Sequence, residues 1–153
     1  MDQEGKRFRF KSLRGRVVLL SFVYTTCPDV CSLVTISMSS VQKGLSDQER
    51  EAVHMLSITT DPEVDTSAVL KSYAERHQVD LAHWSFLTGS IQQVALVWKA
   101  FGITVVKKAR GLVSHTTLTA LLDREGTVRF TYDGSAPDAK IILKDLQTLL
   151  ADG

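Results

Sequence analysis

The sequence predicts an α/β fold in which a central mixed β-sheet is flanked by helices. Short apolar runs rich in β-branched residues alternate with longer segments whose apolar residues recur at helical spacing. Strands that alternate with helices form parallel pairs. Near the end of the chain, two strand-like runs flank a four-residue turn, which adds antiparallel neighbours to the same sheet.

The composition is that of an ordinary globular chain, with 44% apolar and 23% charged residues. We expect residues 1–153 to form a single domain, because this length can bury a sizeable core. A net charge of +1 gives no reason to expect a nucleic-acid partner. No apolar run approaches the roughly 20 residues of a membrane span, and no export signal is evident. We therefore expect a soluble fragment whose N-terminal membrane anchor or export signal lies outside this chain.

The expected elements follow one another in a regular order. After a turn at residues 2–6, residues 7–10 alternate like an edge strand and predict an N-terminal strand or hairpin extension. The main strands are expected at residues 17–23, 53–59, 84–87, 117–122 and 127–132. The helices are expected at residues 28–45, 66–77, 91–101 and 137–150, with Ser46, Thr66, Ser90 and Ser135 at helix starts. A long connection spans residues 103–114. This order, with a cysteine loop after the first main strand, is the thioredoxin-like arrangement.

The two cysteines lie where the first buried strand meets the first helix. Cys27 and Cys31 are four residues apart, and Pro28 suits the first position of a helix. A helix beginning there would stack both sulfurs on one face, with the Cα atoms roughly 6 Å apart and within disulfide reach. The helix dipole favours the thiolate form. The pair therefore suits a soft metal ion or a redox couple, and the plain alternative is two buried structural cysteines.

A histidine is the candidate third ligand. His115 lies between the connection 103–114, which we expect to be flexible, and the strand 117–122, whose edge passes the cysteine loop in a thioredoxin-like fold. Thiolates and imidazole favour Cu(I), whereas structural zinc usually takes four protein ligands, so the sequence favours copper over zinc. The other histidines are more simply explained as surface or helix-end residues: His54, His77 and His83.

Three stretches then show a resemblance to a known family. YTTCPDVC, SITTDPEVDT and LVSHTTLTALLDREGTV are similar to motifs of the Sco/SenC family, thioredoxin-like copper proteins that help to assemble cytochrome c oxidase. The resemblance implies that Cys27, Cys31 and His115 bind copper, as Cu(I) or Cu(II). It also implies that the carboxylates of Asp61 and Asp29 lie near the site and tune it. Family members are usually tethered to the bacterial cytoplasmic membrane or the mitochondrial inner membrane, facing the periplasm or the intermembrane space.

Several functions remain open at this stage. A metallochaperone would deliver copper to the copper-binding subunit of cytochrome c oxidase. A thiol–disulfide oxidoreductase, which unlike a metallochaperone is an enzyme, would use Cys27 and Cys31 as a redox pair. It would keep the oxidase's copper-ligand cysteines reduced. Other copper chaperones or thiol–disulfide proteins would be further partners, and copper-based electron transfer is a third role. A peroxidase is disfavoured, because Tyr24 stands where peroxiredoxins carry threonine. We also expect the 103–114 connection to be mobile without metal and ordered with it.

Overall fold

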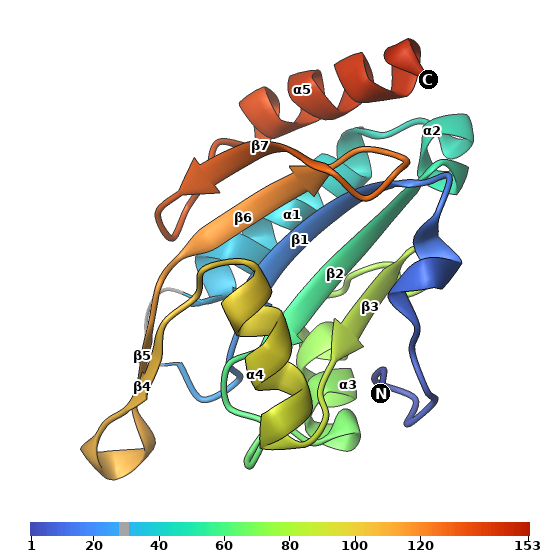
Figure 1. Ribbon diagram of the computed structural model, residues 1–153. Helices are drawn as coiled ribbons and strands as arrows, with labels where there is room; N and C mark the ends of the chain where they lie inside the picture. The colour runs from blue at the N-terminus through green and yellow to red at the C-terminus, as the bar shows by residue number, and fades with distance from the viewer. Residues whose placement is uncertain (28–30) are drawn as a thin grey trace.

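A five-stranded mixed sheet forms the centre of the molecule (Figure 1). The computed structural model describes residues 1–27 and 31–153. The strand order is β3-β2-β1-β6-β7, with β1 parallel to β2, β2 parallel to β3, and the remaining pairs antiparallel. The strands are β1 (Val17–Val23), β2 (Val53–Thr59), β3 (Trp84–Leu87), β6 (Leu118–Leu122) and β7 (Val128–Asp133). The predicted mixed sheet is thus confirmed.

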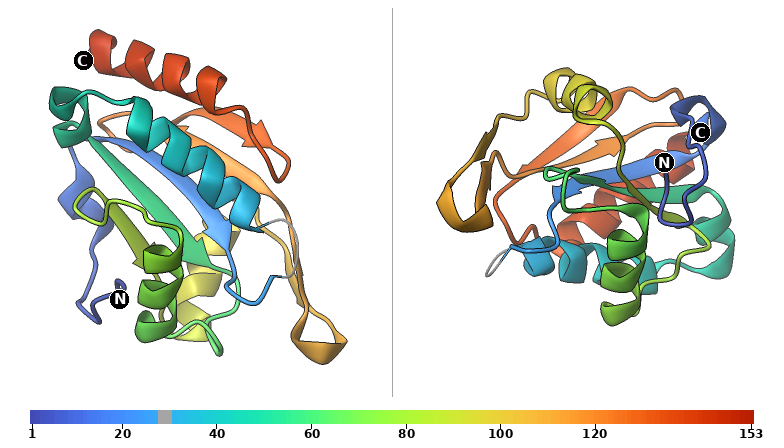
Figure 2. Two further views of the ribbon diagram at one scale, coloured as in Figure 1. Left: turned by 180° about the vertical axis from the view of Figure 1, so that it is seen from behind. Right: turned by 90° about the horizontal axis from the view of Figure 1, so that it is seen from below.

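Helices cover both faces of this sheet (Figure 2). One face packs against α1 (Cys31–Gly44), α3 (Ser67–Arg76) and α5 (Ala139–Asp152), while α4 (Ile91–Ala100) covers the other. The short helix α2 (Asp47–Glu51) leads from α1 into β2. Successive side chains of a strand point to opposite faces, so alternate residues of β1 enter two different cores. Because both faces are covered, every residue of β1 and β2 is buried.

Side-chain caps start the helices close to where the sequence predicts. Ser46 and Glu49 form a reciprocal capping box before α2, and Ser90 and Gln93 form another before α4. Thr66 caps α3 by accepting a hydrogen bond from the Val69 amide. The final helix differs from the prediction, because it begins at Ala139 rather than after Ser135. There the carboxylate of Asp138 accepts a hydrogen bond from the Lys140 amide and so takes the cap position (2.8 Å).

The predicted N-terminal strand at residues 7–10 is wrong. This segment is irregular and ends in a short 3-10 helix, η1 (Phe10–Leu13). The physical reason lies at the outer edge of β3. The Phe86 amide donates to the side-chain oxygen of Gln3, and the Thr88 amide donates to the carbonyl of Met1, both at 3.0 Å. These contacts occupy groups at the edge of β3 that an added strand would need.

The long connection predicted at 103–114 is instead an antiparallel hairpin. It consists of β4 (Val105–Lys107), a 3-10 turn η2 (Ala109–Gly111) and β5 (Val113–His115), with Val105 opposite His115. The hairpin projects beyond the main sheet (Figure 1). Arg110 adopts a positive φ of 64° in the turn, which the sequence does not signal because non-glycine residues rarely adopt that conformation. His115 therefore ends a strand rather than a loose loop.

Candidate metal centre

Two loops meet at the carboxyl ends of β1 and β2. The strands are parallel and in register, so Val23 lies opposite Thr59, and the Thr60 amide donates to the Val23 carbonyl at 2.8 Å. The segment leading to Cys27 follows β1, and the loop containing Asp61 follows β2. Ligand sites of open α/β sheets collect at this edge. The register therefore places the acidic loop beside the cysteine segment.

Asp65 holds these two loops together. The backbone amide of Thr25 donates to its carboxylate at 3.2 Å, and the hydroxyls of Thr25 and Thr59 donate to it at 2.5 and 2.7 Å. Burial raises the pKa of the Asp65 carboxyl, although the hydrogen bonds from Thr25 and Thr59 act in the opposite direction. Sequence reasoning missed this role. The available signal was the second aspartate of DPEVDT together with a threonine at or just after each strand end.

Cys27 packs at the base of the β4–β5 hairpin. Its half-buried side chain packs against the small cluster of Tyr24 and Val113, as Val105 also does, and its backbone amide donates to the Tyr24 carbonyl at 3.3 Å. The Tyr24 ring also meets the His115 imidazole edge-on, with ring centroids 5.7 Å apart. Tyr24 thus contacts both predicted ligands, so that Cys27 and His115 belong to one local cluster.

The hydrogen bond of His115 defines which ring nitrogen carries the proton. Its Nδ1 lies 3.0 Å from the Thr116 carbonyl oxygen. A carbonyl can only accept, so Nδ1 carries the proton and donates it. The neutral ring then has its lone pair on Nε2, the atom that would ligate a metal. Such a bond to the non-ligating nitrogen commonly orients metal-binding histidines.

Asp61 is tied to the hairpin rather than left to solvent. Its side chain is only 4% exposed, and its Oδ1 lies 3.5 Å from the ammonium nitrogen of Lys107 on β4. The same ammonium group lies 2.6 Å from the carboxylate of Glu63. Lys107 therefore bridges the His115 hairpin to the loop after β2. Sequence reasoning placed Lys107 only in a connection and gave it no role.

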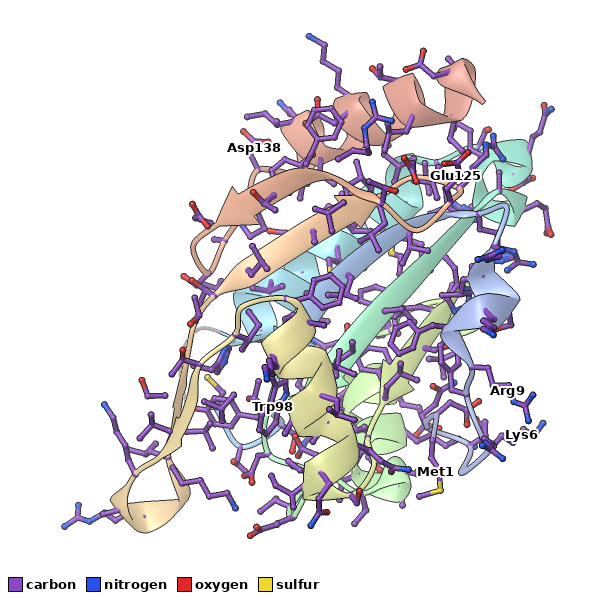
Figure 3. All side chains as sticks on the ribbon, in the orientation of Figure 1. Met1, Lys6, Arg9, Trp98, Glu125 and Asp138 are labelled. Atoms are coloured by element: carbon purple, nitrogen blue, oxygen red, sulfur yellow. The ribbon has the colours of Figure 1, made fainter. Side chains whose placement is uncertain are left out.

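Trp98 closes the neighbouring side of this edge. Trp98 belongs to α4 (Figure 3). Its indole nitrogen donates to the carbonyl of Thr59 at 3.0 Å. This bond satisfies a buried carbonyl at the end of β2. The end of β2 is thus held by Trp98 on one side and by Asp65 on the other.

The remaining predicted site residues are only partly described. Cys31 is the first described residue of α1. Asp29 lies outside the described residues. Among the side chains that the structure describes, which leave out that of Cys31, no group of three His, Cys, Asp or Glu residues is arranged to hold a metal ion. The donor types of Cys27 and His115, thiolate and imidazole, nevertheless suit a soft metal.

The architecture defines the class of protein. A mixed sheet covered on both faces, with a cysteine segment directly after the first parallel strand, is thioredoxin-like. The SCO1/SenC family model matches residues 1–151, and the chain belongs to the SCO1/SenC family. The predicted family resemblance is thereby confirmed. No helix within the described ranges is both long and apolar enough to cross a bilayer.

Known relatives agree with this assignment. The SCO1 protein homolog of Bacillus subtilis is 34% identical over 139 residues, which cover 87% of this chain and 70% of the relative. A SCO1/SenC family lipoprotein from Bacillus anthracis is 32% identical and superposes with a TM-score of 0.88, covering 98% of this chain and 90% of that one.

Two further solved structures bear on function. ScoI of Bradyrhizobium japonicum, solved with copper bound, is 29% identical with a TM-score of 0.83 and covers 97% of this chain and 94% of that one. BsSco, a member of the Sco family of cytochrome c oxidase assembly proteins in which a disulfide switch was identified, is 31% identical with a TM-score of 0.81. The match covers 97% of this chain and 88% of BsSco.

Proposed function

We propose that this protein is a copper-binding metallochaperone that serves the assembly of cytochrome c oxidase. The observation that carries the proposal is the cluster in which Tyr24 contacts both Cys27 and the imidazole of His115, at the carboxyl end of β1. Family membership supports it, because ScoI is solved with copper bound and BsSco belongs to a family of oxidase assembly proteins.

The proposed ligands are the thiolates of Cys27 and Cys31 and Nε2 of His115. Two thiolates and one imidazole form a soft donor set that prefers Cu(I), and the imidazole also suits Cu(II). Copper is the cargo, so release requires that ligands of the partner replace these groups one at a time. The half-buried positions of Cys27 and His115 keep the cluster near the surface, where such exchange can occur. We assign Asp61 and Asp29 as neighbouring carboxylates whose negative charge favours the bound cation.

The proposed setting follows from the same family. We place the protein at the periplasmic side of a bacterial cytoplasmic membrane, or in the mitochondrial intermembrane space if its source is eukaryotic. A lipoprotein among the relatives supports tethering by an anchor outside this chain. The receiving partner is the copper-binding subunit of the oxidase, and other copper chaperones or thiol–disulfide proteins would load or reduce the site.

Anaerobic titration of the reduced protein with Cu(I) against a competing chelator tests this function. We expect tight binding of one copper and loss of that binding in Cys27→Ser and in Cys31→Ser. In His115→Ala the affinity should fall by more than the roughly 10- to 100-fold that loss of an outer-shell partner costs. His77→Ala is the matched control, because His77 ends α3 and should not alter copper affinity. Full retention of binding in either cysteine variant would end the proposal.

A second candidate is thiol–disulfide exchange at the same cysteines, favoured by the disulfide switch of BsSco. The Cys27 thiolate would attack a disulfide between the oxidase's copper-ligand cysteines, forming a mixed disulfide and expelling one partner thiolate. The Cys31 thiolate would then attack the Cys27 sulfur, releasing the second partner thiol and leaving a Cys27–Cys31 disulfide. Two electrons pass to the partner.

A mixed-disulfide trap separates this reaction from copper delivery. With an oxidised peptide of the copper-binding subunit, Cys31→Ser should accumulate a mixed disulfide that is visible by mass spectrometry, because the resolving sulfur is missing. Cys27→Ser should form none if Cys27 is the attacking sulfur. Absence of exchange in the wild-type protein would rule out the reductase role and leave copper delivery unaffected.

A further inference from the structure

The eleven residues before β1, residues 6–16, form a strongly basic segment that we call the basic tract. It contains no carboxylate and six cations: Lys6, Arg7, Arg9, Lys11, Arg14 and Arg16. The other 142 residues carry twelve cations and seventeen carboxylates, so the net charge of +1 conceals +6 on the tract and −5 elsewhere. We propose that the basic tract docks this domain on a phospholipid bilayer that carries anionic lipid.

The charges of the tract face outward and are not neutralised within the protein. Five of its cations are exposed and Arg16 is half-buried. None of the six forms an ion pair with a carboxylate in the described part of the chain, whereas Lys71 and Lys107 elsewhere do. Lys6 and Arg9 extend from the tract on the same side of the molecule (Figure 3). A cluster of this kind attracts the negative surface of a membrane.

An exposed aromatic ring lies among these cations. Phe10 is 46% exposed although it is a large apolar residue. Its ring stands edge-on against Phe8, with centroids 5.7 Å apart, and Phe8 in turn stacks on the buried His54. Phe8 thus supports one side of the Phe10 ring, and the rest of the ring is exposed to solvent. Exposed aromatic rings between cations are typical of segments that bind at the bilayer interface.

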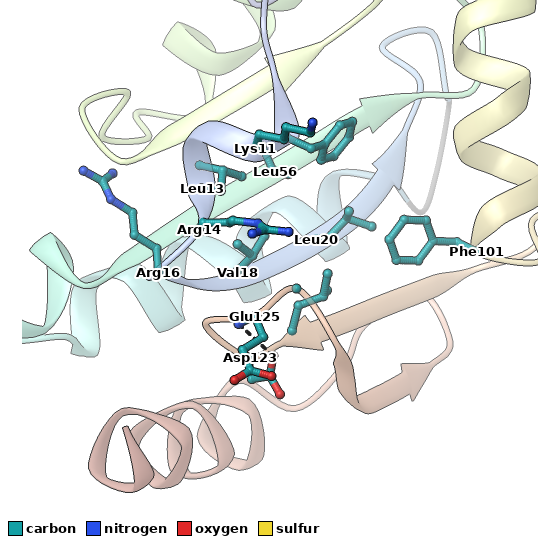
Figure 4. A pocket seen from close by; sticks show the side chains of 13 residues that line it. Lys11, Leu13, Arg14, Arg16, Val18, Leu20, Leu56, Phe101, Asp123 and Glu125 are labelled. Carbon is teal, nitrogen blue, oxygen red and sulfur yellow. Dashed lines mark hydrogen bonds between the residues drawn. The ribbon is translucent and has the colours of Figure 1, made fainter.

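An apolar pocket opens beside the tract (Figure 4). Its volume is about 290 Å³, and its wall includes Leu13, Val18 and Leu20. Lys11 and Arg14 lie along its edge, with Asp123 and Glu125 on the side of the β6–β7 turn. Cations around an apolar hollow suit a lipid, which combines a charged headgroup with an acyl chain.

Nucleic acid fits these observations less well. Proteins that bind single strands present several aromatic rings on which successive bases stack. Of the two aromatic rings in the tract only that of Phe10 is exposed, because Phe8 is half-buried between Phe10 and His54. Charge alone would attract any polyanion, so the apolar contribution of Phe10 is the feature that distinguishes a bilayer.

Docking through the tract would set the orientation of the metal centre. The tract leads directly into β1, and Cys27 follows the other end of that strand. Seven residues of β-strand span about 20 Å. Figures 1 and 2 show η1 and the β4–β5 hairpin on opposite sides of the molecule. A bilayer that contacts the tract therefore leaves the candidate metal centre accessible to a partner.

Vesicle sedimentation tests the proposal. The wild-type protein should bind vesicles of phosphatidylcholine with about 30% phosphatidylglycerol, should not bind pure phosphatidylcholine, and should dissociate as salt rises from about 0.05 to about 0.5 M. Each cation at the surface contributes about fivefold in affinity, so Arg7→Gln/Arg9→Gln/Lys11→Gln should bind roughly 100-fold more weakly. The control Lys43→Gln/Lys99→Gln/Lys140→Gln removes the same charge from exposed positions elsewhere and should bind like the wild type.

The remaining outcomes are equally decisive. Phe10→Ser should weaken vesicle binding without changing binding to heparin, a polyanion with no apolar phase. Equal loss in the tract and control triple variants would show that net charge alone acts, and would overturn the proposal. So would absent binding to anionic vesicles, or a Phe10→Ser variant that binds them like the wild type. Unchanged thermal unfolding of each variant establishes that its fold is intact.

Discussion

His54 is the most strongly perturbed histidine among the described residues. It lies on β2, is only 7% exposed, and its Nε2 is 2.9 Å from the hydroxyl oxygen of Ser85. Burial, with smaller contributions from the charges of Arg16 and His83, lowers the pKa of His54 from 6.5 to about 4. The folded protein therefore holds this ring neutral under conditions in which the unfolded chain would protonate it.

The depressed pKa of His54 predicts an acid-sensitive fold. Its contribution to the free energy of unfolding is present above pH 6.5 and is lost as pH falls from 6.5 towards about 4. The loss approaches about 3 kcal/mol. Urea unfolding at about pH 7 and about pH 4.5 measures it, and His54→Gln should remove most of this pH dependence. The matched His77→Gln change should remove less, because that ring is only half-buried. An unchanged pH slope in His54→Gln would contradict the assignment.

At the scale of elements, the β4–β5 hairpin depends on contacts outside itself. Only three residue pairs join its strands, and it is not part of the five-stranded sheet. Its attachment comes from Val105 and Val113, which pack with Tyr24 and Cys27, and from Lys107, which reaches the acidic loop after β2. A two-stranded hairpin is marginal on its own in water, so these contacts decide where His115 lies.

Removing the Lys107 bridge should loosen the hairpin. In Lys107→Met the buried Asp61 carboxylate loses its cation, and amides of β4 and β5 should exchange with solvent faster. We expect Cu(I) affinity to fall by roughly tenfold, because His115 is held less firmly. Lys107→Arg should restore most of the affinity. Lys108→Met is the control, since Lys108 is the exposed next residue and makes no ion pair in the described part of the chain. Equal effects of the two methionine variants would rule out a specific bridge.

At the scale of the whole molecule, stability is unevenly distributed. The five-stranded sheet has an apolar core on each face, and the helices α1, α3, α4 and α5 cover these cores. The candidate metal centre lies at one edge of this sheet, next to a hairpin that shares only a small cluster with it. Regions with few buried apolar contacts open with less free energy than the core.

Hydrogen exchange should separate these two parts of the protein. Amides of β1 and β2 should exchange only on global unfolding, while those of β4 and β5 exchange through local opening. Cu(I) should slow exchange in the hairpin much more than in the sheet, because the metal would join His115 to the cysteine segment. This result would agree with the expectation that residues 103–114 are mobile without metal and ordered with it. Identical hairpin exchange with and without Cu(I) would exclude the coupling.

Local signals account for the features that could be predicted. The buried runs 17–23 and 53–59 are strands, and Ser46, Thr66 and Ser90 cap helices as expected. Each of these depends on residues within a few positions of one another, so the sequence contains the whole interaction. The cap of the last helix is also local, because Asp138 accepts a hydrogen bond from the Lys140 amide two residues later. That bond starts α5 at Ala139 and not directly after Ser135.

Contacts between distant residues account for what could not be predicted. Gln3 and Met1 bond to the edge of β3, where the predicted N-terminal strand could otherwise have added. Asp65 and Thr25 meet across 40 positions of sequence, and Lys107 and Glu63 across 44. Such partners are chosen by the register of the parallel strands and by the path of the hairpin, not by any local pattern.

The sequence by itself determined the α/β class, the family motifs and the placement of the cysteines after the first buried strand, because periodicity, capping and motif spacing are local properties of the chain. Only the tertiary structure decided that Asp65 fastens the Thr25 backbone, that Lys107 ties the His115 hairpin to Asp61, and that Tyr24 contacts both Cys27 and His115. These pairings arise when the parallel strands β1 and β2 bring their carboxyl ends to one edge, where groups far apart in sequence become neighbours.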